Sequence, residues 1–286
     1  MEEKMGKIGL VIEGGGMRGI YGAGVLDRFL EEGLTFPYCI GVSAGSANLV
    51  SFLSGQKGRN YRYYKYHAKN KNYMSVHNLV RKGSFFGLEY IYDTLTNNLD
   101  ALDYDALLAT QSAFHIVVTK ADTAETVYLD RAHVDYYDST ALMASCAVPV
   151  VCRPIKIGGA EYFDGGVTDP IPYKKALEEG YDKLVVILSR RRGFVKRPEN
   201  FKYLYSRLLQ KYPEIVRALG ERHRVYNESL AELARLEQDG RAVIIAPSVD
   251  VKMSMINNDS RLVDELYDYA THDAEASFEK IYELSR

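Results

Sequence analysis

The amino-acid sequence predicts an α/β protein in which helices cover both faces of a mostly parallel sheet. Short apolar runs that look like buried strands alternate with longer segments of helical periodicity, and this alternation is typical of parallel sheets. Glycine-rich turns follow the first two apolar runs. With 286 residues, 47% of them hydrophobic and 26% charged, the chain has the size and composition of one large globular domain.

The expected strands are short apolar segments bounded by turn residues. They are Lys7–Ile12, Phe36–Val42, Ala113–Thr119, Thr126–Leu129, Pro154–Ile157, Ala160–Phe163, Lys183–Leu188 and Arg241–Ala246. The pair Gly158-Gly159 predicts a tight hairpin, because both central positions of a type I′ turn have positive φ.

Helices are expected between these strands, and the segment 57–110 is expected to be helical and irregular. The regular helices are Gly19–Glu32, Ala44–Leu53, Ser139–Ala147, Ile171–Glu179, 200–238 and Ser260–Ser285. Gly33 and Gly180 end two of them, Asp169 is the expected N-cap of the fourth, and Pro213 restarts the fifth. Because no repeat or linker interrupts the chain, we expect a single domain over residues 1–286, completed by the helical part 200–286.

Charge and cysteine content exclude several classes of protein. The 36 basic and 38 acidic residues give a net charge of −2, so nucleic acid is not an expected partner. Cys39, Cys146 and Cys152 stand outside any CxxC spacing, so we expect neither a metal site nor a disulfide framework. The N-terminal residues lack a signal-peptide hydrophobic region, and no apolar run approaches the roughly 20 residues that span a bilayer. These features predict a cytoplasmic protein.

A first motif, Gly41-Val42-Ser43-Ala44-Gly45, lies between an expected strand and an expected helix. A G-x-S-x-G in a strand–turn–helix context indicates a nucleophile elbow, whose sharp turn requires small residues on both sides of the serine. The Ser43 hydroxyl would then project at a helix N-terminus, where an alkoxide is stabilised. The alternative is an ordinary turn with an N-capping serine, and the context favours the elbow.

A second motif, Gly14-Gly15-Gly16-Met17-Arg18-Gly19, follows the first expected strand. It also fits G-x-G-x-x-G, but a dinucleotide site needs an acidic residue after the second strand, and no acid follows that strand before Glu89. Consecutive glycines before a helix also place backbone N–H groups around one point. We therefore interpret this loop as an oxyanion hole or a phosphate cradle beside Ser43.

A third motif, Asp164-Gly165-Gly166, ends the expected hairpin and supplies a candidate base for Ser43. Its simplest reading is an Asx turn. The order Ser43, Asp164, His272 would fit a catalytic triad, but His272 falls inside an amphipathic helix. His67 and His77 lie in a basic segment without a patterned partner, and His115 alternates within an expected strand and is interpreted as structural.

Together with Ala144-Ser145-Cys146-Ala147-Val148-Pro149, these blocks resemble the patatin-like phospholipases over residues 8–172. The continuation Asp169-Pro170-Ile171-Pro172 is similar to the bacterial branch. The resemblance implies a three-layer α/β/α fold and lipid acyl hydrolysis without metal or cofactor. It implies a Ser43–Asp164 dyad, an oxyanion hole formed by Gly14, Gly15, Gly16 and Arg18, and supporting roles for Gly41, Gly45, Gly165, Gly166 and the Ala144–Pro149 block. The alternatives are a soluble carboxylesterase or thioesterase, and a non-catalytic nucleotide- or phosphate-binding module.

Basic residues are concentrated in two segments. The stretch from Gly33 to Leu88 has no acid and carries Lys57, Arg59, Arg62, Lys65, Lys69, Lys71, Arg81 and Lys82. The second segment carries Arg190, Arg191, Arg192, Lys196 and Arg197. Both segments are expected to rim one mouth and to give reversible contact with an anionic membrane surface. The alternative is that these bases pair with the acidic C-terminal helix.

Overall fold

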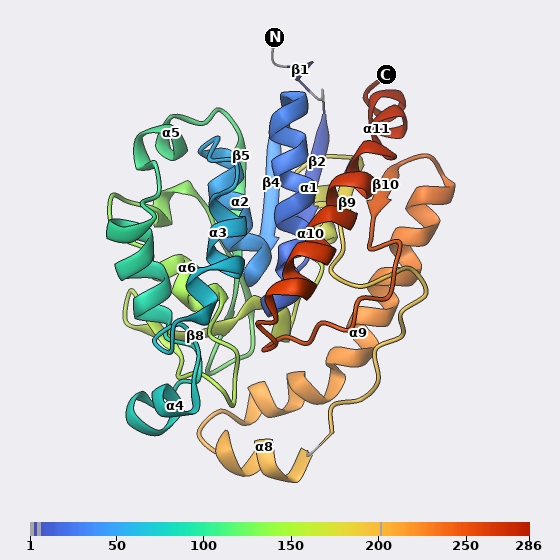
Figure 1. Cartoon of the computed structure of the whole chain (residues 1–286). Coiled ribbons are helices and arrows are strands. Elements are labelled where there is room, and N and C mark those ends of the chain that lie inside the picture. The colour runs from blue at the N-terminus through green and yellow to red at the C-terminus, as the bar shows by residue number, and fades with distance from the viewer. Residues whose placement is uncertain (1–2, 5–6, 201) are drawn as a thin grey trace.

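The computed structural model describes residues 3–4, 7–200 and 202–286, and its centre is an eight-stranded sheet (Figure 1). Parts of two predictions, the hydropathy of the N-terminus and the helix at 200–238, fall on residues 1–2, 5–6 and 201 and lie outside the described residues. Along the sheet the strands are β10 (Ala242–Ile245), β9 (Lys183–Ile187), β2 (Ile8–Ile12), β4 (Tyr38–Val42), β5 (Ala113–Lys120), β8 (Ala160–Asp164) and β7 (Ile155–Ile157). A further strand, β6 (Thr126–Leu129), also pairs with β5.

The direction of the strands confirms the predicted α/β class with a mostly parallel sheet. From β10 to β5, neighbouring strands are parallel, whereas β6, β8 and β7 add antiparallel pairs at one edge. The predicted hairpin turn is present, with φ of 55° at Gly158 and 86° at Gly159. A short parallel pair that was not predicted, β1 (Glu3–Lys4) with β3 (Leu34–Thr35), lies outside the main sheet.

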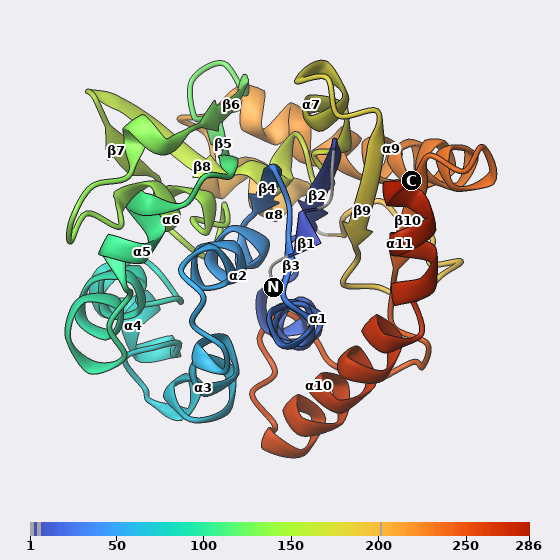
Figure 2. The same ribbon diagram turned by 90° about the horizontal axis from the view of Figure 1, so that it is seen from above.

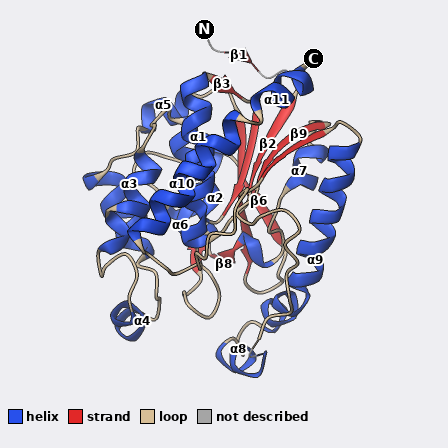
Figure 3. Cartoon of the chain, turned by 45° about the vertical axis from the view of Figure 1, so that its right-hand side comes forward, coloured by secondary structure: helices blue, strands red, loops and turns tan. Residues whose placement is uncertain are grey.

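Helices cover both faces of the sheet and make three layers (Figures 2 and 3). One face carries α1 (Gly19–Glu32), α2 (Ala44–Leu53), α10 (Ser260–Glu275) and α11 (Phe278–Ser285), and the other carries α7 (Tyr173–Glu178) and α9 (Pro213–Gln238). Side chains alternate along the strands: Leu10 and Ile12 belong to one apolar core, and Val11 between them belongs to the other. A strand buried on both faces therefore reads as a continuous apolar run.

The segment 57–110 is helical and irregular, as predicted. It contains α3 (Arg59–Lys65), the 3-10 turn His67–Lys69, α4 (Val76–Lys82), a π-helix (Tyr90–Leu99) and α5 (Tyr104–Ala109). The remaining helices are α6 (Thr140–Ser145) and α8 (Lys202–Leu208), with short 3-10 turns at Gly16–Arg18, Arg131–His133 and Gly165–Val167. Among the described residues, no helix has the length and apolar character needed to cross a bilayer.

Two local predictions are wrong. Asp169 does not cap α7, whose N-cap is Pro172; the Asp169 carboxylate instead accepts a hydrogen bond from the Tyr128 hydroxyl at 2.8 Å. The predicted C-terminal helix is divided at Ala276 and Ser277 into α10 and α11. The Ser277 hydroxyl donates to the Asp273 carbonyl at 2.7 Å, and the break lets α11 turn and pack against β10.

Candidate active site

Ser43 lies in the sharp turn between β4 and α2, with φ of 56° and ψ of −127°. This backbone conformation is strained for a residue other than glycine. The turn packs so tightly on β2 that a Cβ on Gly45 would lie 2.4 Å from the Ile12 carbonyl oxygen. A Cβ on Gly41 would lie 2.7 Å from the Gly45 carbonyl carbon. The turn therefore has the geometry of a nucleophile elbow, and both flanking glycines are sterically required.

The Ser145 side chain connects the elbow to the sheet through hydrogen bonds. Its hydroxyl oxygen accepts a hydrogen bond from the Ser43 N–H at 2.9 Å and donates to the Val117 carbonyl at 2.7 Å. The Ser46 hydroxyl lies 3.0 Å from the same oxygen. Ser145 thus links the strained turn to β5, which gives the Ala144–Pro149 block a place in the architecture of the site.

Replacing Ser145 with alanine should destabilise the fold and disturb the elbow. The Ser43 N–H would lose its acceptor in a buried position, which costs about 1–3 kcal/mol. We expect the free energy of unfolding, measured by urea denaturation, to fall by that amount. Ser206→Ala on α8 is the matched control; equal stability of the two variants would contradict the supporting contact.

Asp164 ends β8 directly beside Ser43. Its side chain is buried, and its Oδ1 accepts a hydrogen bond from the Gly166 N–H at 2.7 Å. Burial raises the pKa of the Asp164 carboxyl, and hydrogen bonds from the Ser43 hydroxyl and the Gly166 N–H oppose that rise. A Cβ on Gly165 would lie 2.4 Å from the Val117 carbonyl oxygen, so this glycine permits the close approach of the Asp164 loop to β5.

The glycine loop lies against the other side of the elbow. A Cβ on Gly14 would come within 2.9 Å of the Ser43 Cβ, and Gly16 has a φ of +56°. Within the described part of the chain, the N–H groups of Gly14, Gly15 and Gly16 have no hydrogen-bond acceptor. The next N–H, that of Met17, is bound to the Met255 carbonyl at 3.0 Å. The loop therefore presents free donors beside the serine.

Ser43 stands where two pockets of different character meet. The first, the apolar pocket, runs under α2 and α3 and is lined mainly by Met17, Val50, Tyr64, Tyr73, Phe86, Leu88, Ile91, Tyr92, Leu142 and Cys146. The second, the polar pocket, lies between the glycine loop and α9 and includes Glu13, Arg18, Asp164, Arg190, Lys196, Glu199, Arg222 and Tyr226. Ser43, Gly16, Val148 and Met255 line both.

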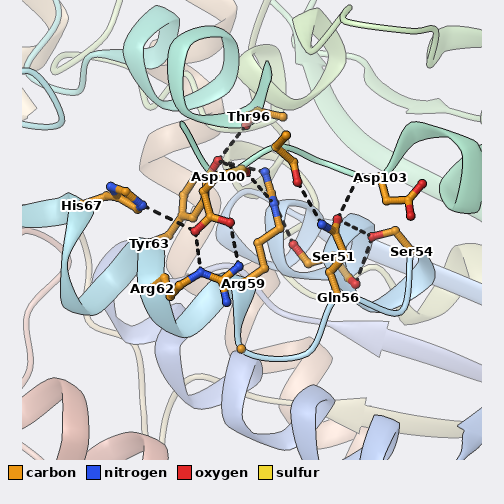
Figure 4. A network of polar contacts seen from close by, with 12 residues as sticks. Ser51, Ser54, Gln56, Arg59, Arg62, Tyr63, His67, Thr96, Asp100 and Asp103 are labelled. Atoms are coloured by element: carbon orange, nitrogen blue, oxygen red, sulfur yellow. Dashed lines mark hydrogen bonds and ion pairs between the residues drawn. The ribbon is translucent and has the colours of Figure 1, made fainter. Parts of the chain in front are cut away.

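Arg59 forms part of the wall of the apolar pocket and is fixed by a network of polar contacts (Figure 4). Its guanidinium donates to the Asp100 carbonyl at 3.0 Å, the Ser51 hydroxyl at 2.9 Å and the Tyr63 hydroxyl at 2.8 Å. The Asp100 carboxylate binds Arg62 through two bonds of 2.7 Å. Burial lowers the pKa of Arg59. Arg59 is therefore not one of the surface bases that the sequence led us to expect.

Most of the other predicted surface bases also have acidic partners. In the first segment Lys57 pairs with Glu31, Lys65 with Asp264 on α10, and Lys82 with Glu89. In the second, Arg191 pairs with Asp250, Arg192 with Glu237 and Lys196 with Glu199. Only part of this pairing involves the C-terminal helices. Two bases of the second segment, Arg190 and Lys196, line the polar pocket.

No histidine among the described residues lines either pocket. His272 is exposed on α10, and the His115 ring is hydrogen-bonded to the Tyr38 hydroxyl at 3.0 Å. Ser43 and Asp164 are thus brought together without a histidine between them.

Sequence reasoning missed Glu13 and the contribution of α9. The Glu13 carboxylate accepts hydrogen bonds from the Ser189 N–H at 2.6 Å and from the Tyr226 hydroxyl at 2.9 Å. Burial raises the pKa of Glu13, and these hydrogen bonds oppose the rise. Its position as a lone acid between an apolar strand and three glycines was an available signal. Arg222 and Tyr226 lie in a long amphipathic helix whose pattern marks no residue as part of a site.

Models of two protein families match parts of this chain. The model of the patatin-like phospholipase family matches residues 10–177, and that of a domain of unknown function (DUF6363) matches residues 212–285. The uncharacterized protein YjjU of Escherichia coli (strain K12) is 30% identical over 201 residues, which cover 69% of this chain and 56% of YjjU. The chain therefore spans about half the length of this curated relative.

A comparison of folds finds VipD from Legionella pneumophila, with a TM-score of 0.42 and 15% identity over 94% of this chain and 67% of that one. The distant likeness adds nothing to the assignment, which rests on the family model. That model covers more than half of the 286 residues and includes the elbow, the glycine loop and the Asp164 loop. The chain belongs to the patatin-like phospholipase family.

Proposed function

We propose that the protein is a serine-dependent lipid acyl hydrolase of the phospholipase A or lysophospholipase type. The observation that carries this proposal is the pairing of Ser43, strained in an elbow, with the buried carboxyl of Asp164. The free N–H groups of Gly14, Gly15 and Gly16 lie beside the pair and are suited to an oxyanion. Arg18, two residues after Gly16, lines the polar pocket next to this pair and adds the positive charge of its guanidinium.

In the proposed reaction, the Ser43 oxygen attacks the ester carbonyl carbon and its proton passes to the Asp164 carboxylate. The C–O bond to the leaving alcohol breaks, and the alcohol oxygen takes that proton from Asp164. Water then gives a proton to Asp164 and attacks the acyl carbon. The proton returns to Ser43 as the acyl-enzyme bond breaks, and the carboxylic acid is released.

The apolar pocket supports an acyl substrate with a hydrocarbon chain. It opens at Ser43 and is lined by aromatic and aliphatic side chains, so a chain bound there would leave its carbonyl beside the hydroxyl. The polar wall formed by Arg59, Tyr63 and Thr96 has its hydrogen bonds satisfied within the protein. The hydrocarbon chain should therefore extend no further than this wall. A methylene group that displaced these hydrogen-bonded polar groups would make binding no more favourable.

Labelling with a fluorophosphonate tests the proposal directly. We expect one covalent adduct, located by peptide mass analysis on Ser43, and release of fatty acid from lysophospholipid micelles. Hydrolysis of short soluble esters without hydrolysis of lipid would favour the esterase or thioesterase alternative. Absence of both labelling and turnover, with nucleotide or phosphate bound, would favour the binding module.

The pH dependence of kcat/KM should report the environment of Asp164. Burial raises the pKa of this carboxyl, and the proposed base acts only when ionised. Activity should therefore be lost as the pH falls through a value above the ordinary range of aspartate, near 3.9. The measurement is kcat/KM for a neutral soluble ester as a function of pH, from the lowest pH at which the protein stays folded up to neutral pH. An acid limb at or below the ordinary aspartate range would contradict this base.

We further propose that the protein works as a peripheral protein on an anionic lipid surface, through α4 and α8. These helices project at the end of the molecule opposite both termini (Figure 1). Their exposed apolar side chains are Val76, Leu79, Val80, Tyr203, Leu204 and Leu208, and the same helices carry the exposed bases Arg81, Lys82, Lys202 and Arg207. The chain next to α4 lines the apolar pocket, and the chain on both sides of α8 lines the polar one. Apolar and basic side chains together fit an anionic interface.

The double variant Val80→Ser, Tyr203→Ser should weaken co-sedimentation with anionic vesicles by roughly tenfold or more, given what burial of two apolar side chains contributes. Hydrolysis of a soluble ester should not change. Leu99→Ser removes a similarly exposed apolar side chain away from these helices and is the control. Unaltered vesicle binding by the double variant would exclude α4 and α8 as the docking face.

We also propose that residues 1–286 act as one catalytic domain. Two features support this: α10 packs along α1, and Arg222 and Tyr226 of α9 line the polar pocket. The segment matched by the domain of unknown function would then supply part of the active-site wall.

A further inference from the structure

Four basic side chains converge on the polar pocket beside Ser43. Arg18 follows the glycine loop, Arg190 and Lys196 lie in the segment after β9, and Arg222 lies on α9. Their positive charges oppose one another. Burial, and then repulsion from Arg190, lower the pKa of Arg18 to about 10. Burial, and then repulsion from Arg222, lower the pKa of Lys196.

The carboxylates of the pocket do not balance this charge. Glu199 is shared between Lys196 at 2.9 Å and Arg222 at 3.5 Å. Glu13 and Asp164 are the other two acidic residues of the pocket, so three acids face four bases. In the described part of the chain, Arg18 and Arg190 form no ion pair. The pocket is therefore left with excess positive charge.

The guanidinium groups also have donors to spare. The Arg18 Nε is buried and has no hydrogen-bond partner among the described residues. The Arg190 guanidinium lies 4.6 Å from the centre of the Phe194 ring, so the ring covers its face and leaves its N–H edge open. An unpaired buried donor is costly. A phosphate group, with several anionic oxygens, can accept charge-assisted hydrogen bonds from several such donors at once.

We propose that the polar pocket selects an unmasked phosphate on the leaving group, so that among phospholipids the preferred substrates are acyl esters of a phosphomonoester alcohol. This rests on the proposed function, in which the acyl chain fills the apolar pocket. Because Ser43 is at the junction of the two pockets, the alcohol side of the scissile ester then faces Arg18, Arg190, Lys196 and Arg222. Four cations disfavour a quaternary ammonium near the phosphate, so lipids with an unmasked phosphate should be preferred over zwitterionic ones.

The test compares hydrolysis of lysophosphatidic acid, lysophosphatidylcholine and monoacylglycerol that carry the same acyl chain. Wild-type kcat/KM should be highest for lysophosphatidic acid. Arg190→Gln and Lys196→Gln should each lower that preference over monoacylglycerol by roughly 10- to 100-fold, the range of a charge-assisted hydrogen bond. Arg191→Gln and Arg197→Gln, on the same segment but outside the pocket, are the matched controls and should retain the preference.

Binding of glycerol 3-phosphate and of inorganic phosphate, measured by calorimetry at constant ionic strength, is the second readout and needs no turnover. Loss of glycerol 3-phosphate binding in Arg190→Gln and Lys196→Gln, without hydrolysis of any ester by the wild type, would overturn the proposed function and keep the anion site. Equal hydrolysis of the three lipids, unaffected by the variants, would overturn the phosphate site. Inorganic phosphate that binds as tightly as glycerol 3-phosphate and leaves lipid turnover unchanged would assign the pocket to free phosphate and overturn the leaving-group role.

Discussion

Replacing Ser43 with alanine is expected to abolish fluorophosphonate labelling and to lower kcat for ester hydrolysis by roughly 10⁴-fold or more, as for other serine nucleophiles. Residual activity would come from the glycine-loop donors and from substrate binding, which the substitution leaves in place. The measurements are adduct mass and single-turnover rate with a soluble ester. Labelling that persists in the variant, or that maps to Ser145, would remove Ser43 from the mechanism.

A second variant separates loss of chemistry from loss of structure. Ser43→Gly should be equally inactive but more stable than Ser43→Ala by roughly 1 kcal/mol or more, because glycine accepts the strained conformation at position 43 without that cost. Comparison of their urea denaturation curves measures the difference. Equal stability would mean that the turn relaxes in the variants.

The Asp164→Asn variant is expected to lose nearly as much activity as Ser43→Ala, roughly 10⁴-fold, because residues that act as a unit are not additive. Asparagine keeps an oxygen that accepts from the Gly166 N–H but cannot take the serine proton. The double variant Ser43→Ala, Asp164→Asn should be no slower than the worse single variant.

Stability distinguishes this result from unfolding. Because burial raises the pKa of Asp164 in the folded state, ionisation of its carboxyl costs stability as the pH rises through the range above its unfolded pKa. Asp164→Asn should therefore have a Tm at or above that of the wild type at neutral pH, and the difference should narrow in acid. His272→Ala and His223→Ala are the controls that should keep most activity. If His272→Ala were as inactive as Asp164→Asn, a catalytic triad would replace the dyad.

Local sequence was sufficient for the elements around the elbow. The segment Ala44–Leu53 has the same bounds in the prediction and in the structure, and Gly33 ends α1 in the left-handed conformation. In both, small residues at fixed spacing determine the backbone within a few positions. The error at Asp169 arose because its carboxylate accepts a hydrogen bond from the Tyr128 hydroxyl, 41 residues earlier in the chain. Spacing within the segment gives no information about that partner. The break at Ser277 is local, because its hydroxyl donates to the carbonyl of Asp273, four residues earlier.

The α/β class and the short segments proposed as nucleophile, base and oxyanion loop could be predicted from local sequence. Each depends on steric requirements that glycine and small residues satisfy locally. The surroundings of these segments depend on how distant parts of the chain fold together. Folding buried Arg59 and paired Lys65 with Asp264, and it brought Arg222, more than 170 residues along the chain from Ser43, into the same pocket. Whether a base faces solvent, a carboxylate or a ligand depends on contacts between segments far apart in sequence, and a local pattern carries no information about those contacts.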